Sequence, residues 1–527
     1  MSRSTPSSRC VTEAEAIMLD RRSLLAMTGA ASLFAGPLRA SRREDSFDAA
    51  LAGDSRLLGW ASPPVDYFEP RPLEIEGTWP ADLQGMFRRI GPAAHCRHGL
   101  RYRHWFDADG MIQEFRLDGS GVTHRGRMLK TPKLAFEDRE GERLLPAFAT
   151  LPEGARPVRR ADDMNTANTA LVDHRGELLA LWEGGSASII DRESLSWEAF
   201  KSWGAGLEGL PFTAHPKVEP DGTLWAFGLA SVPYGALVLY HIPGNGAAVR
   251  AEVIPLEQPG FVHDFVVTRD FLVIVIPPFV HDPEVAGTFL DSHVWKPDLG
   301  SRVLVVRKDD FSSRRWVQLP AAFGFHHGNG WNEDDGTIHF DFFLADDPSL
   351  LEDAFTKVMD GLLVEASVPR FTRIELHPDG SFTIAGDGGG GDFPTINPAK
   401  VSRRHRYLYN VSSTSGTPAW LPGTIEKRDL ETGRLERFDP GEGIQVEEHL
   451  FIPFRHATKE DDGWLIGSFL DSSTARSGVA VFDARGVADG PLARAWLPFP
   501  LPLGFHGQFS PVLRPGAAAS PVSCSAA

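Results

Sequence analysis

Histidines recur at one place in a repeated pattern of this sequence, a few residues ahead of a turn that opens an apolar strand. The distance is six residues from His215 to the turn at Asp221 and nine from His326 to the turn at Asp335. The candidates are His215, His263, His326 and His456, with His506 in a similar setting just before the C-terminal tail. Imidazoles that meet at one point without thiolates suit Fe, Cu, Zn or Ni. The recurrence predicts a shared metal site, and the spacing leaves open which four of the five take part.

Net charge and cysteine count exclude some kinds of partner and of metal site. The chain carries 53 basic and 70 acidic residues, and its formal charge of -17 argues against a nucleic-acid partner, because such a surface repels phosphate backbones. Of the three cysteines, Cys10 and Cys524 lie in the tails, which leaves only Cys96 in the body of the chain. This count excludes an internal disulfide framework and a cysteine-based metal site.

The elements that would position the histidines are hairpins that recur along the chain. Each begins at a turn, often Asp-Gly, and continues as a short strand rich in β-branched and aromatic residues. First strands are expected at Asp109–Leu117, Arg175–Trp182, Asp221–Gly228, Arg269–Ile276, Asp335–Phe343, Arg404–Val411 and Asp462–Leu470. Second strands are expected at Ala187–Ile190, Ala236–His241, Arg302–Val306, Phe371–Leu376, Thr424–Arg428 and Val479–Phe482. Seven units, with a spacing as short as 46 residues from 175 to 221, predict an all-β fold, a seven-bladed β-propeller rather than two stacked sheets.

A propeller explains how histidines far apart in sequence could meet. Equivalent positions on successive blades are related by rotation about one axis, so side chains that point inward from them converge on that axis. One helix is also expected, at Ser349–Ala366, because apolar residues recur along one face of it. We interpret this helix as a cap over the propeller rather than a membrane-binding segment, since few basic residues lie on its other face.

The first forty residues have the pattern of a bacterial export signal. Arg21 and Arg22 open a short apolar run to Ala35, and small residues follow up to Ala40. The run is shorter than the roughly 20 apolar residues that span a bilayer. We therefore expect a twin-arginine signal peptide at 1–40 and a mature protein that is periplasmic or exported. The remaining chain is expected to comprise an N-terminal segment at 41–70, a single propeller domain at 71–512 and a flexible tail at 513–527.

Processing of this segment can be tested directly. N-terminal sequencing of protein recovered from the periplasm should find residues 1–40 removed, because a signal peptide is cleaved after export. Periplasmic protein with these residues intact would contradict the prediction.

Several segments, in this order, resemble the carotenoid cleavage oxygenase family. They are Phe106–Met111, Asn165–Thr169, Leu181–Glu183, Ala214–Pro216, Val262–Phe265, Phe325–Asn329, Asp392–Asn397 and Gly504–Gly507. Each is short, but the ordered set is specific, and the resemblance extends from about Pro72 to Ser510. It implies a dome of loops and short helices over the propeller axis and one Fe(II) per chain held by four histidines. The implied ligands are His215, His263, His326 and His506.

The resemblance also assigns the residues around these ligands. His326 is favoured over His327, because only one of two adjacent strand residues points inward, and His456 is left with a structural role. Three carboxylates are implied to accept hydrogen bonds from the ligating imidazoles, which fixes their tautomers. They are Glu183, Asp392 and Glu448. The family more often has glutamate at the second of these positions, so the shorter Asp392 is expected to need a water or a shifted strand.

The implied reaction is cleavage by O₂ of a conjugated carbon–carbon double bond in a carotenoid or apocarotenoid, giving carbonyl products. Stilbene cleavage is the nearest alternative, but that branch engages a phenol through Tyr and Lys, and Met128 stands near Lys130 where the Tyr would be expected. Retinoid isomerisation on the same iron and a non-catalytic ligand-binding propeller are further alternatives. An oily substrate is compatible with peripheral membrane contact, and no oligomeric state follows. Candidates to line an apolar tunnel are Phe323, Phe325, Trp331 and Phe505, with Phe343 and Phe509.

Overall fold

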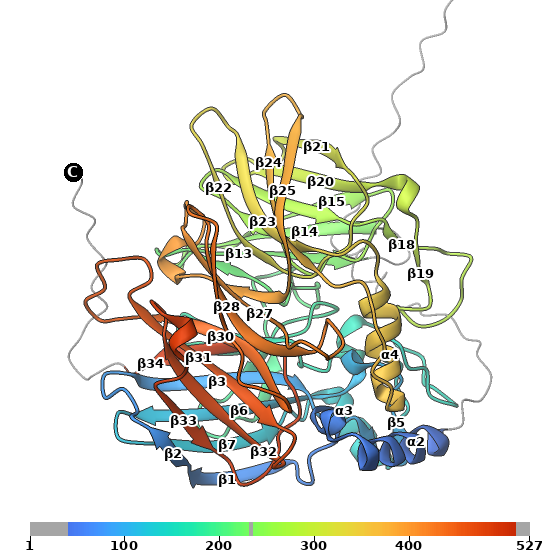
Figure 1. The fold of residues 1–527 in the computed structure, drawn as a ribbon. Helices are drawn as coiled ribbons and strands as arrows, with labels where there is room; N and C mark the ends of the chain where they lie inside the picture. The colour runs from blue at the N-terminus through green and yellow to red at the C-terminus, as the bar shows by residue number, and fades with distance from the viewer. Residues whose placement is uncertain (1–39, 231–234, 513–527) are drawn as a thin grey trace, which may run out of the picture.

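The computed structural model describes residues 40–230 and 235–512, and most of its regular structure is β-strand (Figure 1). Residues 1–39 of the predicted signal peptide and the predicted tail at 513–527 lie outside the described residues. Within the described ranges the strands form seven sheets of four or five strands and two sheets of two strands. The seven larger sheets are the blades of a propeller, so the predicted fold class is confirmed.

The blades, each written from the axis outward, have the following strands. The first contains β34 (Gly507–Pro511), β3 (Gln84–Pro92), β6 (Gly110–Asp118), β7 (Val122–Met128) and β1 (Tyr67–Pro72). The second contains β8 (Ala170–His174), β9 (Glu177–Leu181), β10 (Ser188–Ile190) and β11 (Trp197–Phe200), and the third β12 (Lys217–Val218), β13 (Leu224–Ala230), β14 (Gly235–Ile242) and β15 (Arg250–Leu256). The fourth contains β16 (Val266–Val267), β17 (Phe271–Ile276), β20 (Ser301–Arg307) and β21 (Arg314–Leu319).

The other three blades complete the ring. The fifth contains β22 (His327–Asn332), β23 (Ile338–Leu344), β24 (Arg370–Leu376) and β25 (Phe382–Gly390), and the sixth β26 (Asp392–Thr395), β27 (Tyr407–Ser413), β28 (Pro422–Asp429) and β29 (Arg434–Phe438). The seventh contains β30 (Ile444–Pro453), β31 (Gly463–Asp471), β32 (Arg476–Asp483), β33 (Ala493–Trp496) and β2 (Glu74–Gly77). The seven predicted first strands correspond to β6, β9, β13, β17, β23, β27 and β31, with boundaries shifted by a few residues.

The two ends of the described chain close the ring twice. β34 pairs with β3 from Gly507↔Arg89 to Pro511↔Gly85, and β2 pairs with β33 from Glu74↔Trp496 to Gly77↔Ala493. Figure 1 shows the resulting neighbourhood of blue and red strands. Each pairing adds a strand from one end of the described chain to the blade formed near the other end, which holds the first and last blades together.

Apolar side chains fill the interfaces between neighbouring blades. In β13, Leu224 and Ala226 face the second blade while Trp225 and Phe227 face the fourth, because alternate residues of a strand point to opposite faces of its sheet. All four are buried. Burial on both faces explains why such strands have nearly continuous apolar sequences.

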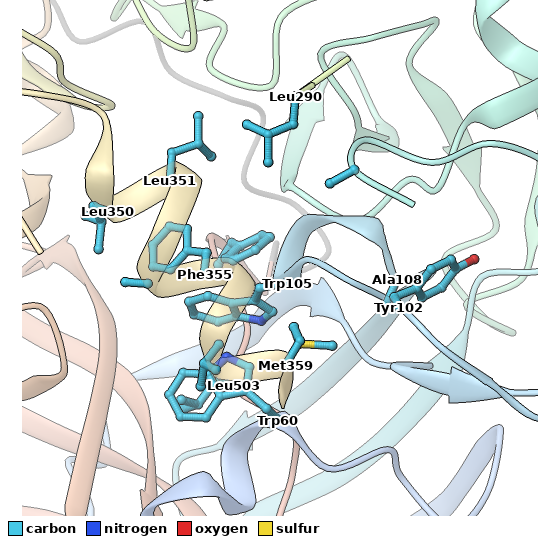
Figure 2. Packing of buried hydrophobic residues seen from close by; sticks show 14 of the residues in the cluster. Trp60, Tyr102, Trp105, Ala108, Leu290, Leu350, Leu351, Phe355, Met359 and Leu503 are labelled. Atoms are coloured by element: carbon cyan, nitrogen blue, oxygen red, sulfur yellow. The ribbon is translucent and has the colours of Figure 1, made fainter. Parts of the chain in front are cut away.

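Helices and irregular segments form a dome at the end of the axis where the inner strands begin. They include α2 (Ala40–Gly53), α3 (Pro132–Glu140), α4 (Phe355–Lys357), short turns η1 (Ser55–Trp60), η2 (Trp105–Asp107), η3 (Ala161–Met164), η5 (Leu350–Ala354) and η6 (Val358–Asp360), and the hairpins β4 (Cys96–Arg97)–β5 (Leu100–Arg101) and β18 (Phe279–His281)–β19 (His293–Trp295). Further short turns are η4 (Pro297–Leu299), η7 (Pro398–Lys400) and η8 (Val487–Asp489). Trp60, Trp105 and Phe355 pack together in the dome core (Figure 2), with ring centroids 5.3 Å apart for the first two and 5.2 Å for the last two.

The predicted helix at Ser349–Ala366 is shorter than expected. It begins as a π-helical turn at Leu350, continues through α4 and ends in a 3₁₀ turn at Asp360. Gly361 follows with φ 85°, a left-handed conformation that terminates helices. Leu362, which directly follows Gly361 in the predicted range, is 52% exposed as a result. No helix in the described ranges is both long and apolar enough to cross a membrane.

Gly91 in β3 gives a test of the ring closure. A β-carbon added there would lie 2.3 Å from the Cα of Gly504, so Gly91→Ala requires two backbones to separate. We expect the free energy of unfolding, measured by urea denaturation, to fall by about 1–3 kcal/mol. Gly121→Ala, at the β6–β7 turn of the same blade, is the control because open space surrounds it. Equal stability of the two variants would show that the close approach is not maintained.

Candidate metal centre

Four histidines meet at the dome end of the axis. His326 and His506 immediately precede the inner strands β22 and β34, while His215 and His263 lie two and three residues before β12 and β16. One potential ligand atom from each of the four lies within 4.8 Å of the others. The Nε2 atoms of His215 and His263 are 2.8 Å apart, and those of His326 and His506 are 3.1 Å apart. Blades one, three, four and five therefore each contribute one imidazole.

The other three blades contribute the carboxylates. Nδ1 of His263 lies 2.7 Å from Oε2 of Glu183, which follows β9 in the second blade. Nδ1 of His326 lies 2.8 Å from Oδ1 of Asp392, the first residue of β26 in the sixth blade. In the seventh blade, Oε1 of Glu448 on β30 lies 2.9 Å from Nδ1 of His506. Carboxylates at Nδ1 direct the Nε2 lone pairs of these imidazoles toward the common centre. Asp392 makes its contact directly, so the shorter side chain needs no bridging water.

The donor set fits a divalent transition metal. Burial, reinforced by neighbouring imidazoles, holds the pKa of His215 and of His326 well below the ordinary histidine value. Both rings are therefore neutral at pH 7, so each can offer a nitrogen lone pair to a cation. Burial also raises the pKa of Asp392 to about 7. A nearby cation would favour its ionised form.

Two adjacent glutamates hold the segment that carries His506. Besides its contact with the imidazole, Glu448 accepts a hydrogen bond from the Gly507 N–H at 2.7 Å. Glu447 accepts one from the Gly504 N–H at 2.5 Å and forms a buried ion pair with Arg89 on β3. The backbone on both sides of His506 is therefore fixed by side chains of the seventh blade.

The two remaining candidate histidines lie apart from the centre. His327 turns away from His326 and stacks on Phe342, with ring centroids 3.7 Å apart. His456 is exposed in a turn after β30. The strand geometry that separates His326 from His327 follows from the opposite orientation of neighbouring strand residues.

A cavity of about 1200 Å³ lies under the dome and reaches His263, His326 and His506. Aromatic side chains supply much of its wall: Trp105, Phe106, Phe148, Trp182, Phe227, Phe261, Phe289, Phe325, Phe355, Phe393, Trp420 and Phe505. In the described part of the chain, neither a tyrosine nor a lysine lines it. Such a wall suits a flat, apolar molecule.

The predicted lining residues divide into two groups. Phe325 and Phe505 line the cavity, whereas Phe323 and Trp331 do not. Phe323 packs behind Phe325, with ring centroids 5.3 Å apart, and Trp331 stacks on His339 within the fifth blade at 5.0 Å. Proximity to a histidine in sequence did not by itself identify the lining, because Phe323 lies behind Phe325 and Trp331 lies further along β22.

Two other predicted lining residues pack between blades, and several residues that do line the cavity were not predicted. Phe343 packs at the interface of the fifth and sixth blades, and Phe509 packs against the core between the seventh and first. Sequence reasoning missed Phe261 and Phe393, among others. The available signal was position: Phe261, Phe325 and Phe505 each stand one or two residues before a histidine that reaches the cavity.

Known proteins resemble this chain over most of its length. The sequence profile of the retinal pigment epithelial membrane protein family, which includes the carotenoid cleavage oxygenases, matches residues 62–511. The chain belongs to this family. A carotenoid 9,10(9',10')-cleavage dioxygenase from Crocus sativus is 30% identical over 491 residues, covering 86% of this chain and 88% of the relative. An isoeugenol monooxygenase from Pseudomonas nitroreducens is 25% identical over 487 residues, covering 87% and 98%.

A solved structure of the family also matches. The crystal structure of cobalt-substituted apocarotenoid oxygenase from Synechocystis has a TM-score of 0.80 and 25% identity, and the match covers 87% of this chain and 98% of the other. The chain is thus an enzyme of the carotenoid cleavage oxygenase type, a double-bond-cleaving oxygenase with a four-histidine metal site. The alternative of a non-catalytic ligand-binding propeller is set aside by this membership.

The contact between Glu448 and His506 gives a test of the metal site. Glu448→Gln keeps the shape of the side chain but removes its charge, so we expect the affinity for a divalent metal to fall about 10–100-fold. Competition with a chelator of known affinity measures the change. Glu442→Gln, at an exposed position, is the matched control. Unchanged affinity in Glu448→Gln would contradict a role for this carboxylate at the metal site.

Proposed function

We propose that the chain is an Fe(II)-dependent dioxygenase that cleaves a conjugated double bond of a carotenoid or apocarotenoid to carbonyl products. The observation that carries the proposal is the large aromatic cavity that reaches three of the four converging histidines. A polyene held in it would place its double bonds beside the metal site. The relatives that act on carotenoids and apocarotenoids, by their names, support the same substrate class.

Iron is supported by the donor set and by the family. Four imidazoles without thiolates would suit a ferrous ion, and iron held by them would supply the activation of O₂. The implied ligands are His215, His263, His326 and His506, and the implied hydrogen-bond acceptors are Glu183, Asp392 and Glu448. These carboxylates orient three of the rings and offset part of the metal's charge.

The aromatic side chains of the cavity would bind the substrate by packing alone. Phe261, Phe325 and Phe505 belong to the dome core and line the cavity, where they would exclude water and hold a rigid chain by contact with its faces. Glu183 and Asp392 also line the cavity, but each already contacts an imidazole. The reaction needs no Ser-His-Asp set, because O₂ rather than a protein nucleophile attacks the substrate.

Stilbene-type substrates remain the second candidate, favoured by the isoeugenol monooxygenase relative. Met128 is buried away from the cavity, and Lys130 forms ion pairs with Asp66 and Asp138. A Tyr–Lys pair does exist, since Lys133 donates to the Tyr102 hydroxyl at 2.9 Å, but both side chains are fully buried and Lys133 also pairs with Asp109. A phenol in the cavity would therefore meet neither group among the described lining residues, which favours a polyene.

Product analysis separates the two substrate classes. Iron-loaded protein incubated in air with a carotenoid, an apocarotenal and a hydroxystilbene should convert at least one polyene into two carbonyl fragments, detected by mass spectrometry. His326→Ala and iron-free protein should give no product, because the metal site is incomplete. Conversion of the hydroxystilbene alone would favour the second candidate, and no turnover of any of the three would count against both.

We further propose that a bacterium exports the chain through the twin-arginine route. The proposal rests on the Arg21-Arg22 pattern and the short apolar run after it. This route carries folded proteins, which suits an enzyme that acquires its metal before export.

A further inference from the structure

His215 differs from the other three histidines in how it is held. Within the described residues, no carboxylate lies within ion-pair distance of its ring, and it is not among the residues that line the cavity. The strand that follows it, β12, is also one of the two shortest inner strands and pairs with β13 only through Lys217↔Trp225 and Val218↔Leu224. The His215 N–H donates to Oγ1 of Thr213 at 2.9 Å, but this bond lies within the same segment. A contact to another blade is needed to fix the segment relative to the other three histidines.

That contact is an ion pair beside the metal site. Nζ of Lys217, two residues after His215, lies 2.7 Å from Oδ1 of Asp264. Asp264 directly follows His263 and belongs to the next blade, and its side chain is only 2% exposed. The pair therefore ties the segment that carries His215 to the segment that carries His263.

The same carboxylate reaches a third blade. Oδ2 of Asp264 accepts a hydrogen bond from the backbone N–H of His327 at 2.9 Å, and His327 directly follows His326. A third hydrogen bond, from the N–H of Phe265 to Oδ1 at 2.7 Å, fixes the carboxylate to its own strand. One buried side chain thus joins three consecutive blades at positions one or two residues from three of the four histidines.

We propose that Asp264 and Lys217 are positioning residues of the metal site: their ion pair holds His215 in place, as direct carboxylate contacts hold the other three histidines. The proposal concerns the four-histidine site and is independent of the substrate. A buried ion pair can also be purely structural, since loss of one partner leaves an uncompensated buried charge. The test must therefore measure the metal site separately from the stability of the fold.

Cobalt binding provides that measurement. Metal-free protein is titrated with Co²⁺ against a chelator, and the visible absorption of the bound ion reports its coordination. We expect Asp264→Asn to lower the affinity about tenfold or more and to change the spectrum, because His215 is no longer fixed. Lys217→Met should do the same, whereas Lys217→Arg should retain affinity and spectrum, since its guanidinium can still pair with Asp264.

The matched control is Glu426→Gln. Glu426 is a buried carboxylate in the sixth blade that pairs with Arg428 and Arg437, away from the four histidines. It should lower the thermal stability of the metal-free protein without changing Co²⁺ affinity or spectrum. Asp264→Asn or Lys217→Met protein that loses stability as this control does, yet binds Co²⁺ with unchanged affinity and spectrum, would overturn the proposal. If Asp264→Asn fails to fold, Lys217→Met decides alone, because Lys217 is 22% exposed and tolerates replacement better.

Discussion

The pairing of β34 with β3 is the interaction on which the rest of this structure depends. It closes the ring between the last and first described blades, and β34 begins directly after His506. The fourth imidazole therefore reaches the metal site only when the two ends of the propeller meet. Arg89 on β3, Glu447 on β30 and the Gly504 N–H form a buried network at this junction, so closure and placement of the ligand use the same contacts. Metal binding to such a site is coupled to completion of the fold.

The seven blades contribute two kinds of side chain to the metal site. Four blades present a histidine where the inner strand begins, and the other three present Glu183, Asp392 and Glu448 to three of those rings. Three of the four imidazoles thus have their Nε2 directed inward by a carboxylate from another blade. The exception is His215, whose segment is tied through Lys217 to Asp264. A closed ring can bring these groups together because every blade contributes to the same axis.

The dome turns the metal site into a place where an apolar molecule can react. Phe261, Phe325 and Phe505 belong both to the dome core and to the cavity wall, so the packing that stabilises the dome also shapes the cavity. Charged groups near the histidines are already engaged with imidazoles or with each other. The aromatic side chains beside the histidines lower the local dielectric, which strengthens electrostatic interactions there.

The sequence by itself determined the seven first strands, the histidines before the inner strands and, through family motifs, the three carboxylates, because these depend on local turn chemistry and on short segments. Only the tertiary structure decided which aromatic residues face the cavity: Phe323 and Trp331 also stand near His326 in sequence, but Phe323 packs behind Phe325 and Trp331 stacks on His339 within the fifth blade. It likewise ended the predicted helix at Gly361 and left His456 exposed in a turn. The junction of Lys217, Asp264 and the His327 N–H could not be foreseen, because it joins three blades whose relative positions are set by closure of the ring rather than by any local pattern.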